Sequence, residues 1–158
     1  MSSFKSQNPY TLKLNQEFDA LSKAEIMQKL EQSAECYRNW SKLSLGQRIA
    51  HLRKLPELLK SRKGELSAVI VREMGKPQKQ ALAEIEKCAW LCEYFLEQAP
   101  ELLKNDKVLT DYSESYIQYD PIGGILGIMP WNFPFWQVFR YAFPALLAGN
   151  VVLLKHAP

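Results

Sequence analysis

The sequence has few cysteines, little excess of either charge and no apolar leader, and each shortage excludes a class of protein. Three cysteines among 158 residues, at positions 36, 88 and 92, form no spaced disulfide framework, so we expect reduced thiols in a cytoplasmic protein. Twenty basic residues stand against 17 acidic ones and are spread along helical patterns, so no nucleic-acid partner is implied. The first ten residues contain one lysine and no apolar segment, which argues against a secretory signal.

Residues 122–154 are apolar enough to raise the question of a membrane segment. Three prolines interrupt this stretch, and Asn132, Gln137 and Arg140 would need burial in lipid. No uninterrupted span of about 20 apolar residues remains, so we expect no membrane contact.

Residues 1–100 are predicted to form an N-terminal helical region. Two capping boxes, each a serine followed three residues later by a glutamate or glutamine, predict two helix starts: Ser22 with Glu25, and Ser44 with Gln47. Pro56 is expected to kink the second helix. A third helix around residues 65–74 should stop at Gly75, and a fourth from residue 78 should end at Pro100.

Beyond Pro100 the apolar pattern changes from helical spacing to alternation. Residues 107–112 and 115–119 alternate around a polar turn, which predicts a β-hairpin within a region spanning 101–120. The rest of the given sequence, residues 121–158, is predicted to form the start of a further, incomplete domain.

That last region reads as strand, helix and strand. Short apolar runs at residues 125–129 and 151–154 flank a helix-length stretch at 133–147, which predicts a right-handed βαβ unit with parallel strands buried on both faces. Because two parallel strands cannot cover their own faces and edges, we expect the sheet to be incomplete within these residues.

Four motifs give the sequence a family resemblance. P-W-N-F-P at residues 130–134 is followed by P-A-L-L-A-G-N at 144–150 and by L-K-H-A-P at the end, with E-M-G-K-P upstream at 73–77. Together they resemble the aldehyde dehydrogenase superfamily from about Arg48 onward. With A-E-I-E-K-C-A at 83–89, the chain looks most like the N-terminal portion of bacterial succinate-semialdehyde dehydrogenases that accept NAD or NADP. The implied α/β fold has N-terminal helices, a β-hairpin and the first βαβ unit of a Rossmann-like domain.

The resemblance assigns a catalytic role to Asn132, which matches the family asparagine whose amide group donates to the oxyanion formed when a thiolate attacks the aldehyde. It lies where a parallel strand ends, the position at which open α/β sheets bind ligands. Such a donor contributes on the order of 3 kcal/mol in the transition state. The alternative is that Asn132 caps the helix expected to start near Phe133.

The resemblance also implies a binding site for the NAD or NADP cofactor. Met129, Pro130, Trp131 and Asn132 match cofactor contacts, and Lys155 matches the lysine that binds the adenosine ribose; alternatively Lys155 is an ordinary solvated lysine. Pro158 stands where many NAD-preferring relatives have a ribose-binding glutamate. Loss of that repulsive charge should make NADP acceptable, with His156 or Lys155 pairing with the phosphate. His156, Ala157 and Pro158 complete the set of expected cofactor contacts.

Three residues are candidates for binding the small aldehyde substrate. Phe133, Gln137 and Arg140 recur at helical spacing and should share the face that lines the substrate tunnel in the family. Arg140 is the single charge in an apolar stretch. A buried guanidinium needs a partner, either the carboxylate of a semialdehyde or a structural acid elsewhere in the fold.

None of the three cysteines matches the family nucleophile, which in the family lies further along the chain, as does the water-activating glutamate. Cys88 and Cys92 lie one helical turn apart without further ligands at zinc spacing, so no metal is expected and buried thiols are favoured. We therefore expect these 158 residues to be inactive alone and the hairpin to support homo-oligomerisation. The competing hypothesis is a non-catalytic fragment that retains only assembly or nucleotide contacts.

Overall fold

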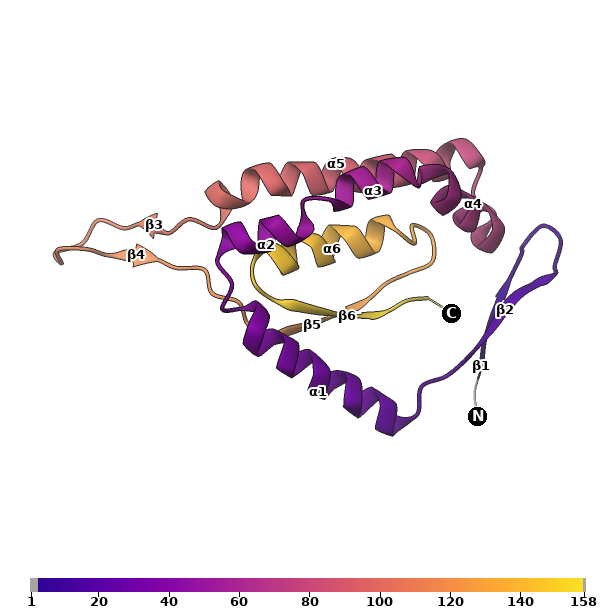
Figure 1. Ribbon diagram of the computed structural model, residues 1–158, viewed down its shortest axis with the longest axis horizontal. Coiled ribbons are helices and arrows are strands. Elements are labelled where there is room, and N and C mark those ends of the chain that lie inside the picture. Colours follow the sequence, from indigo (N-terminus) through magenta and orange to yellow (C-terminus); the bar gives the residue numbers. More distant parts are fainter. Residues whose placement is uncertain (1–2, 158) are drawn as a thin grey trace.

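Both capping boxes form at the predicted helix starts. The structure is a computed structural model that describes residues 3–157, and Figure 1 shows its course. Helix α1 (Lys23–Trp40) begins after Ser22, whose hydroxyl accepts from the backbone N–H of Glu25 while the Glu25 carboxylate accepts from the N–H of Ser22. Ser44 and Gln47 make the same reciprocal pair before α2 (Leu45–Leu52).

Two prolines act differently from the prediction. Pro56 does not kink one helix; α2 ends at Leu52, and Pro56 lies in the first turn of the separate helix α3 (Leu55–Ser61), where its missing N–H costs nothing. Helix α4 (Lys63–Met74) stops at Gly75, which has a φ of 72°, as predicted. Helix α5 (Gln78–Leu102) runs through Pro100 to Leu102, because near the helix end a proline removes one hydrogen bond without ending the chain's helical course.

Antiparallel hairpins occur at both ends of the helical region. The first, β1 (Ser3–Gln7) with β2 (Leu14–Asp19), was not predicted and lies within the region expected to be helical. Its turn is held by Asn8 Oδ1, which accepts from the N–H groups of Tyr10 and Thr11 at 2.9 Å. The second, β3 (Asp106–Lys107) with β4 (Tyr116–Ile117), confirms the predicted hairpin, although its paired strands are only two residues long.

The last region forms the predicted parallel βαβ unit. Strands β5 (Gly124–Ile128) and β6 (Val151–Lys155) pair in parallel from Gly124 opposite Val151 to Ile128 opposite Lys155. Helix α6 (Trp136–Leu147) connects them and begins at Trp136 instead of residue 133, because residues 131–135 form turns. The expectation of strands buried on both faces is wrong for this chain, since apolar strand side chains such as Leu126, Ile128 and Leu154 are exposed.

One apolar core joins the helical region to the βαβ unit. Its fully buried side chains come from α4, α5 and α6, among them Ile70, Ile85, Cys88, Cys92, Phe143 and Leu147. In Figure 1, α6 lies between the α3–α5 layer and the strand pair, while α1 crosses the opposite face of the strands. Within residues 3–157, no helix has the length and apolar character needed to cross a membrane.

Both ends of α6 are held by side chains of the helical region. At its C-terminal end the Trp40 indole N–H donates to the Leu146 carbonyl at 2.9 Å, and Arg48 Nε donates to the Leu147 carbonyl at 2.8 Å. A cation at a helix C-terminus also interacts favourably with the helix dipole. The βαβ unit is therefore fixed to the helices by specific polar contacts as well as by the core.

Gly127→Ala is expected to destabilise the protein by about 1–3 kcal/mol, because the added Cβ would lie 2.2 Å from Cζ of Tyr141. Tyr141 is pinned by its hydroxyl, which donates to the Leu153 carbonyl at 3.0 Å. The control is Gly64→Ala in the first turn of α4, where no heavy atom lies within 4 Å of the added Cβ and no loss of stability is expected. Urea unfolding measures the stability of both variants. Equal unfolding midpoints for the two variants would contradict the expected overlap between the added Cβ at position 127 and the Tyr141 ring.

Candidate active site

The carboxyl ends of β5 and β6 open onto a groove. The backbone N–H of Met129 donates to the Lys155 carbonyl at 3.0 Å, so the segments that follow the two strands start side by side. The strand-end groove has a volume of about 270 Å³. Its walls come from α4, the two strand ends and the start of α6: Val69, Ile70, Glu73, Met74, Met129, Pro130, Trp131, Pro134, Phe135, Val138, His156 and Ala157.

The predicted cofactor residues divide into those that line this groove and those beside it. The first group is Met129, Pro130, Trp131, His156 and Ala157. Asn132 and Lys155 are the neighbours of lining residues in the chain and are exposed. Pro158 lies outside the described residues.

Lys155 is held at the strand end by local contacts. Its ammonium donates to the His156 carbonyl at 2.8 Å and lies 5.6 Å from the centre of the Phe4 ring on β1. His156 Nδ1 lies 2.6 Å from the Ala157 carbonyl. Despite these contacts Lys155 remains exposed at the edge of the sheet.

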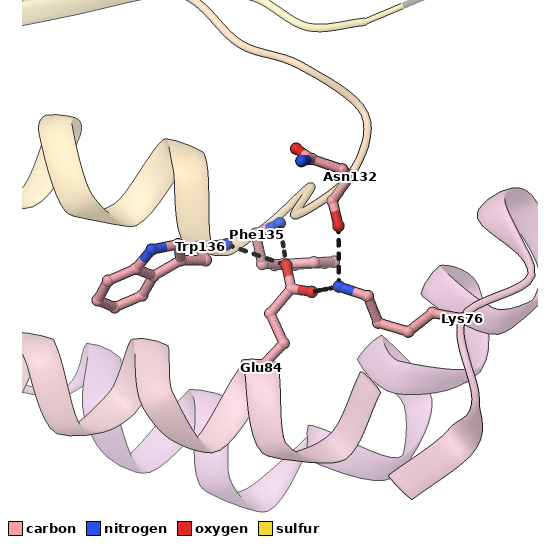
Figure 2. A network of polar contacts seen from close by, with 5 residues as sticks. All are labelled: Lys76, Glu84, Asn132, Phe135 and Trp136. Atoms are coloured by element: carbon pink, nitrogen blue, oxygen red, sulfur yellow. Dashed lines mark hydrogen bonds and ion pairs between the residues drawn. The ribbon is translucent and has the colours of Figure 1, made fainter. Parts of the chain in front are cut away.

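Asn132 does not cap helix α6, which removes the structural alternative considered for it. Figure 2 shows its backbone carbonyl turned toward Lys76 and its carboxamide directed away, and the carbonyl accepts from Lys76 Nζ at 3.0 Å. The helix cap is supplied instead by Glu84 of α5, whose Oε1 accepts from the N–H groups of Phe135 and Trp136 at 3.0 and 3.1 Å.

Lys76 and Glu84 form a buried ion pair beneath the turn that carries Asn132. Their side chains are 6% and 1% exposed, and Nζ of Lys76 donates to Oε2 of Glu84. The same ammonium lies 3.8 Å from the centre of the Phe133 ring. Since removal of one partner from a buried pair typically costs about 3–5 kcal/mol, this pair strongly constrains residues 132–136.

Reasoning from the sequence alone did not find this pair. Both residues stand within the motifs that carry the family resemblance, E-M-G-K-P and A-E-I-E-K-C-A, but neither was given a role. One signal was available, because Glu84 falls on the same helical face as Ala81, Ile85 and Cys88, all fully buried. A carboxylate in a buried apolar stripe requires a partner.

The three predicted substrate residues lie at the start of α6 and on it. Phe133 precedes the helix, although its carbonyl accepts from the Gln137 N–H at 3.0 Å, and its ring contacts Lys76. Arg140 is exposed, so the premise that it is buried is wrong for this chain, and it makes no ion pair within residues 3–157. Gln137 and Arg140 are three residues apart and share one side of α6.

The thiols of α5 are chemically inert. Burial raises the pKa of Cys88 to about 12, with the negative charge of Glu84 adding to the effect. Burial likewise raises the pKa of Cys92 to about 12, with a contribution from Glu93. Both thiols therefore stay protonated at neutral pH and cannot act as nucleophiles.

A parallel βαβ unit with a groove beyond the carboxyl ends of its strands places the chain among the α/β proteins, a class whose open sheets typically bind ligands at that edge. The family model for the aldehyde dehydrogenase family matches residues 1–158, so the chain belongs to this family. The resemblance inferred from the motifs is thereby confirmed.

Individual relatives agree with this assignment. The chain is 48% identical over 150 residues to a probable succinate-semialdehyde dehydrogenase (NADP+) of Synechocystis sp., covering 95% of this chain and 33% of the relative. It is 45% identical over 134 residues to the succinate semialdehyde dehydrogenase (NAD(P)+) Sad of Escherichia coli K12, covering 85% and 29%. The chain thus spans about a third of the length of these curated relatives.

A solved structure shows the same arrangement of elements. The succinic semialdehyde dehydrogenase of Streptococcus pyogenes, in complex with NADP+, superposes with a TM-score of 0.93 at 30% identity. The match covers 98% of this chain and 34% of that one. The α/β fold, with helices, hairpin and βαβ unit, is therefore that of aldehyde dehydrogenases over the same portion.

In the native protein, Cys88 and Cys92 are expected to resist iodoacetamide at pH 8 while the exposed Cys36 of α1 reacts, because alkylation needs a thiolate that can be reached. Peptide mapping by mass spectrometry measures the label at each position. In urea all three thiols should react, which controls for reagent quality. Fast native labelling of Cys88 or Cys92 would contradict the burial described for α5.

Proposed function

We propose that the full-length polypeptide carrying residues 1–158 oxidises succinate semialdehyde, or a similar small aldehyde, to the acid with NAD+ or NADP+. The observation that carries this proposal is the strand-end groove, in which Met129, Pro130 and Trp131 meet His156 and Ala157. These residues come from the two separate motifs that resemble the family's cofactor contacts. Likeness to succinate-semialdehyde dehydrogenases at 45% and 48% identity supports the substrate class.

Asn132 is the catalytic residue that this chain contributes. Its carboxamide is not used for capping α6 and is directed away from the Lys76–Glu84 pair, so its N–H groups are available to an oxyanion (Figure 2). As the aldehyde carbon becomes tetrahedral, the oxygen gains negative charge. A preorganised amide donor stabilises that charge by on the order of 3 kcal/mol.

The residues at the strand ends fit a dinucleotide. Met129, Pro130 and Trp131 offer apolar surface for rings, and the exposed ammonium of Lys155 suits ribose hydroxyls or a phosphate. Bound there, the nicotinamide would accept the hydride that leaves the aldehyde carbon. We propose that both cofactors are used, since Pro158 brings no carboxylate against a 2′-phosphate.

Arg140 is proposed to bind the carboxylate of the semialdehyde. It is exposed on α6 and unpaired within residues 3–157, so its guanidinium is free for a bidentate contact. Gln137 on the same side of α6 and Phe133 just before it would complete this wall of the substrate site.

The 158 residues alone are proposed to be inactive, because none of their thiols suits the family's nucleophile. Cys88 and Cys92 are buried and protonated, and Cys36 lies on α1 away from the strand-end groove. Homo-oligomerisation through the β3–β4 hairpin is also proposed. Its exposed apolar side chains support this role: Leu109, Tyr112, Tyr116, Ile117 and Tyr119.

The activity is tested by comparing residues 1–158 with the longest polypeptide that the gene encodes. With succinate semialdehyde and NAD+ or NADP+, the longer chain should produce reduced cofactor and residues 1–158 should produce none; omitting the aldehyde is the control. Turnover by residues 1–158 would contradict their inactivity. A folded longer chain without turnover on small aldehydes would contradict the proposed function.

Arg140→Ala is expected to lower kcat/KM for succinate semialdehyde by about 10- to 150-fold, corresponding to the loss of a charge-assisted contact worth about 1.5–3 kcal/mol. Turnover of butanal, which has no carboxylate, should be unchanged and serves as the internal control. Arg140→Lys should give an intermediate loss, because lysine keeps the positive charge but cannot form the two parallel hydrogen bonds of a guanidinium. Equal losses on both aldehydes would contradict carboxylate binding.

A further inference from the structure

The buried pair of Lys76 and Glu84 has no part in the proposed chemistry, yet both residues form hydrogen bonds to the turn that carries Asn132. Neither residue is among those that line the strand-end groove. Lys76 comes from the loop between α4 and α5, and Glu84 from α5, so both belong to the helical region and not to the βαβ unit. The pair therefore connects two parts of the fold at the position of the candidate oxyanion donor.

The two side chains fix the turn at both of its ends. Lys76 holds the Asn132 carbonyl at 3.0 Å, and Glu84 holds the N–H groups of Phe135 and Trp136 at 3.0 and 3.1 Å. Lys76 and Glu84 also hold each other. The turn cannot rotate about its ends without breaking one of these contacts, and the two side chains that make them are almost fully buried.

Holding the carbonyl of Asn132 constrains the backbone from which its side chain projects. Figure 2 shows the carbonyl pointing down to Lys76 and the carboxamide extending the other way. The ammonium of Lys76 is fully engaged, by the Glu84 carboxylate, the Asn132 carbonyl and the face of the Phe133 ring at 3.8 Å. It therefore has no N–H left with which to compete for the carboxamide of Asn132.

We propose that Lys76 and Glu84 are positioning residues, which orient the carboxamide of Asn132 for oxyanion binding by fixing its backbone carbonyl and the first turn of α6. This inference rests on the proposed function of Asn132. Because a displacement of about 1 Å at a reacting group can lower a rate about 100-fold, loss of the pair should lower kcat even where the fold survives.

The test uses the full-length polypeptide with the double variant Lys76→Met, Glu84→Gln. Methionine is close to lysine in length, and the glutamine oxygen can still accept from Phe135 and Trp136, so both charges are removed without leaving one stranded. The matched control is Lys63→Met, Glu86→Gln. That pair joins α4 to α5 at 2.6 Å, but it is about half exposed.

The pair variant is expected to lower kcat by about 10- to 100-fold with an unchanged KM for the cofactor, and the control to leave both unchanged. Glu84→Gln alone, which places an amide N–H against the ammonium, should lower kcat in the same direction. Amide hydrogen exchange across residues 132–136 should be faster in the pair variant than in the control. Wild-type kcat in a folded pair variant would overturn the inference.

A double-mutant cycle with Asn132→Ala separates positioning from general packing. Asn132→Ala alone should lower kcat by about 100- to 1,000-fold. If the pair acts through Asn132, its removal in the Asn132→Ala background should cause no further loss. Losses that multiply would overturn the inference while leaving the proposed function intact. Full activity of Asn132→Ala would overturn the role of Asn132 and the inference with it, and no aldehyde oxidation by the unsubstituted chain would overturn the proposed function itself.

Discussion

The burial of one face of α5 is the constraint on which the rest of the structure depends. Ile85, Cys88 and Cys92 lie on that face without solvent exposure, and Phe143 and Leu147 of α6 are buried in the same core. Full burial of each large apolar side chain contributes about 1.5–3 kcal/mol, so this contact exceeds any single polar interaction in the chain. It places α6 under the helical layer and thereby decides where the strands on its other side must lie.

Polar contacts then fix the register of α6 relative to the helical region. An apolar interface alone allows one helix to slide along another. Glu84 binds the N-terminal end of α6 and Arg48 binds its C-terminal end, and both contacts can form in only one alignment of the helices. The helix dipole favours this distribution of charge at both ends. Strand β5 follows, because the Asn150 side chain accepts from the N–H groups of Ile122 and Gly123 and ties the starts of the two strands together.

Local signals made much of this fold predictable. The capping boxes at Ser22 and Ser44, the glycine stop at Gly75 and the βαβ unit each depend on neighbours in sequence, and each is confirmed. The errors lie where the local signal was weak or was misread. Helix α5 continues through Pro100, and the β1–β2 hairpin is polar on much of its surface, so it carries little apolar periodicity to detect. Its Asn8-Pro9 turn was the available signal.

The candidate site shows the same division between local and distant information. Family motifs pointed to Asn132, but its capping alternative could be removed only by seeing Glu84, 51 residues away from Phe135, occupy the helix end. No spacing rule connects those positions, since their proximity results from the packing of α5 on α6. Distant information is also needed at the ends of β5 and β6, where the apolar side chains of Ile128 and Leu154 are exposed. Two parallel strands leave apolar surface that further structure would need to cover, and the relatives that share this portion are about three times as long. The backbone geometry around Asn132 is therefore set by the helical region, while the apolar surface of the two strands depends on further structure for its cover.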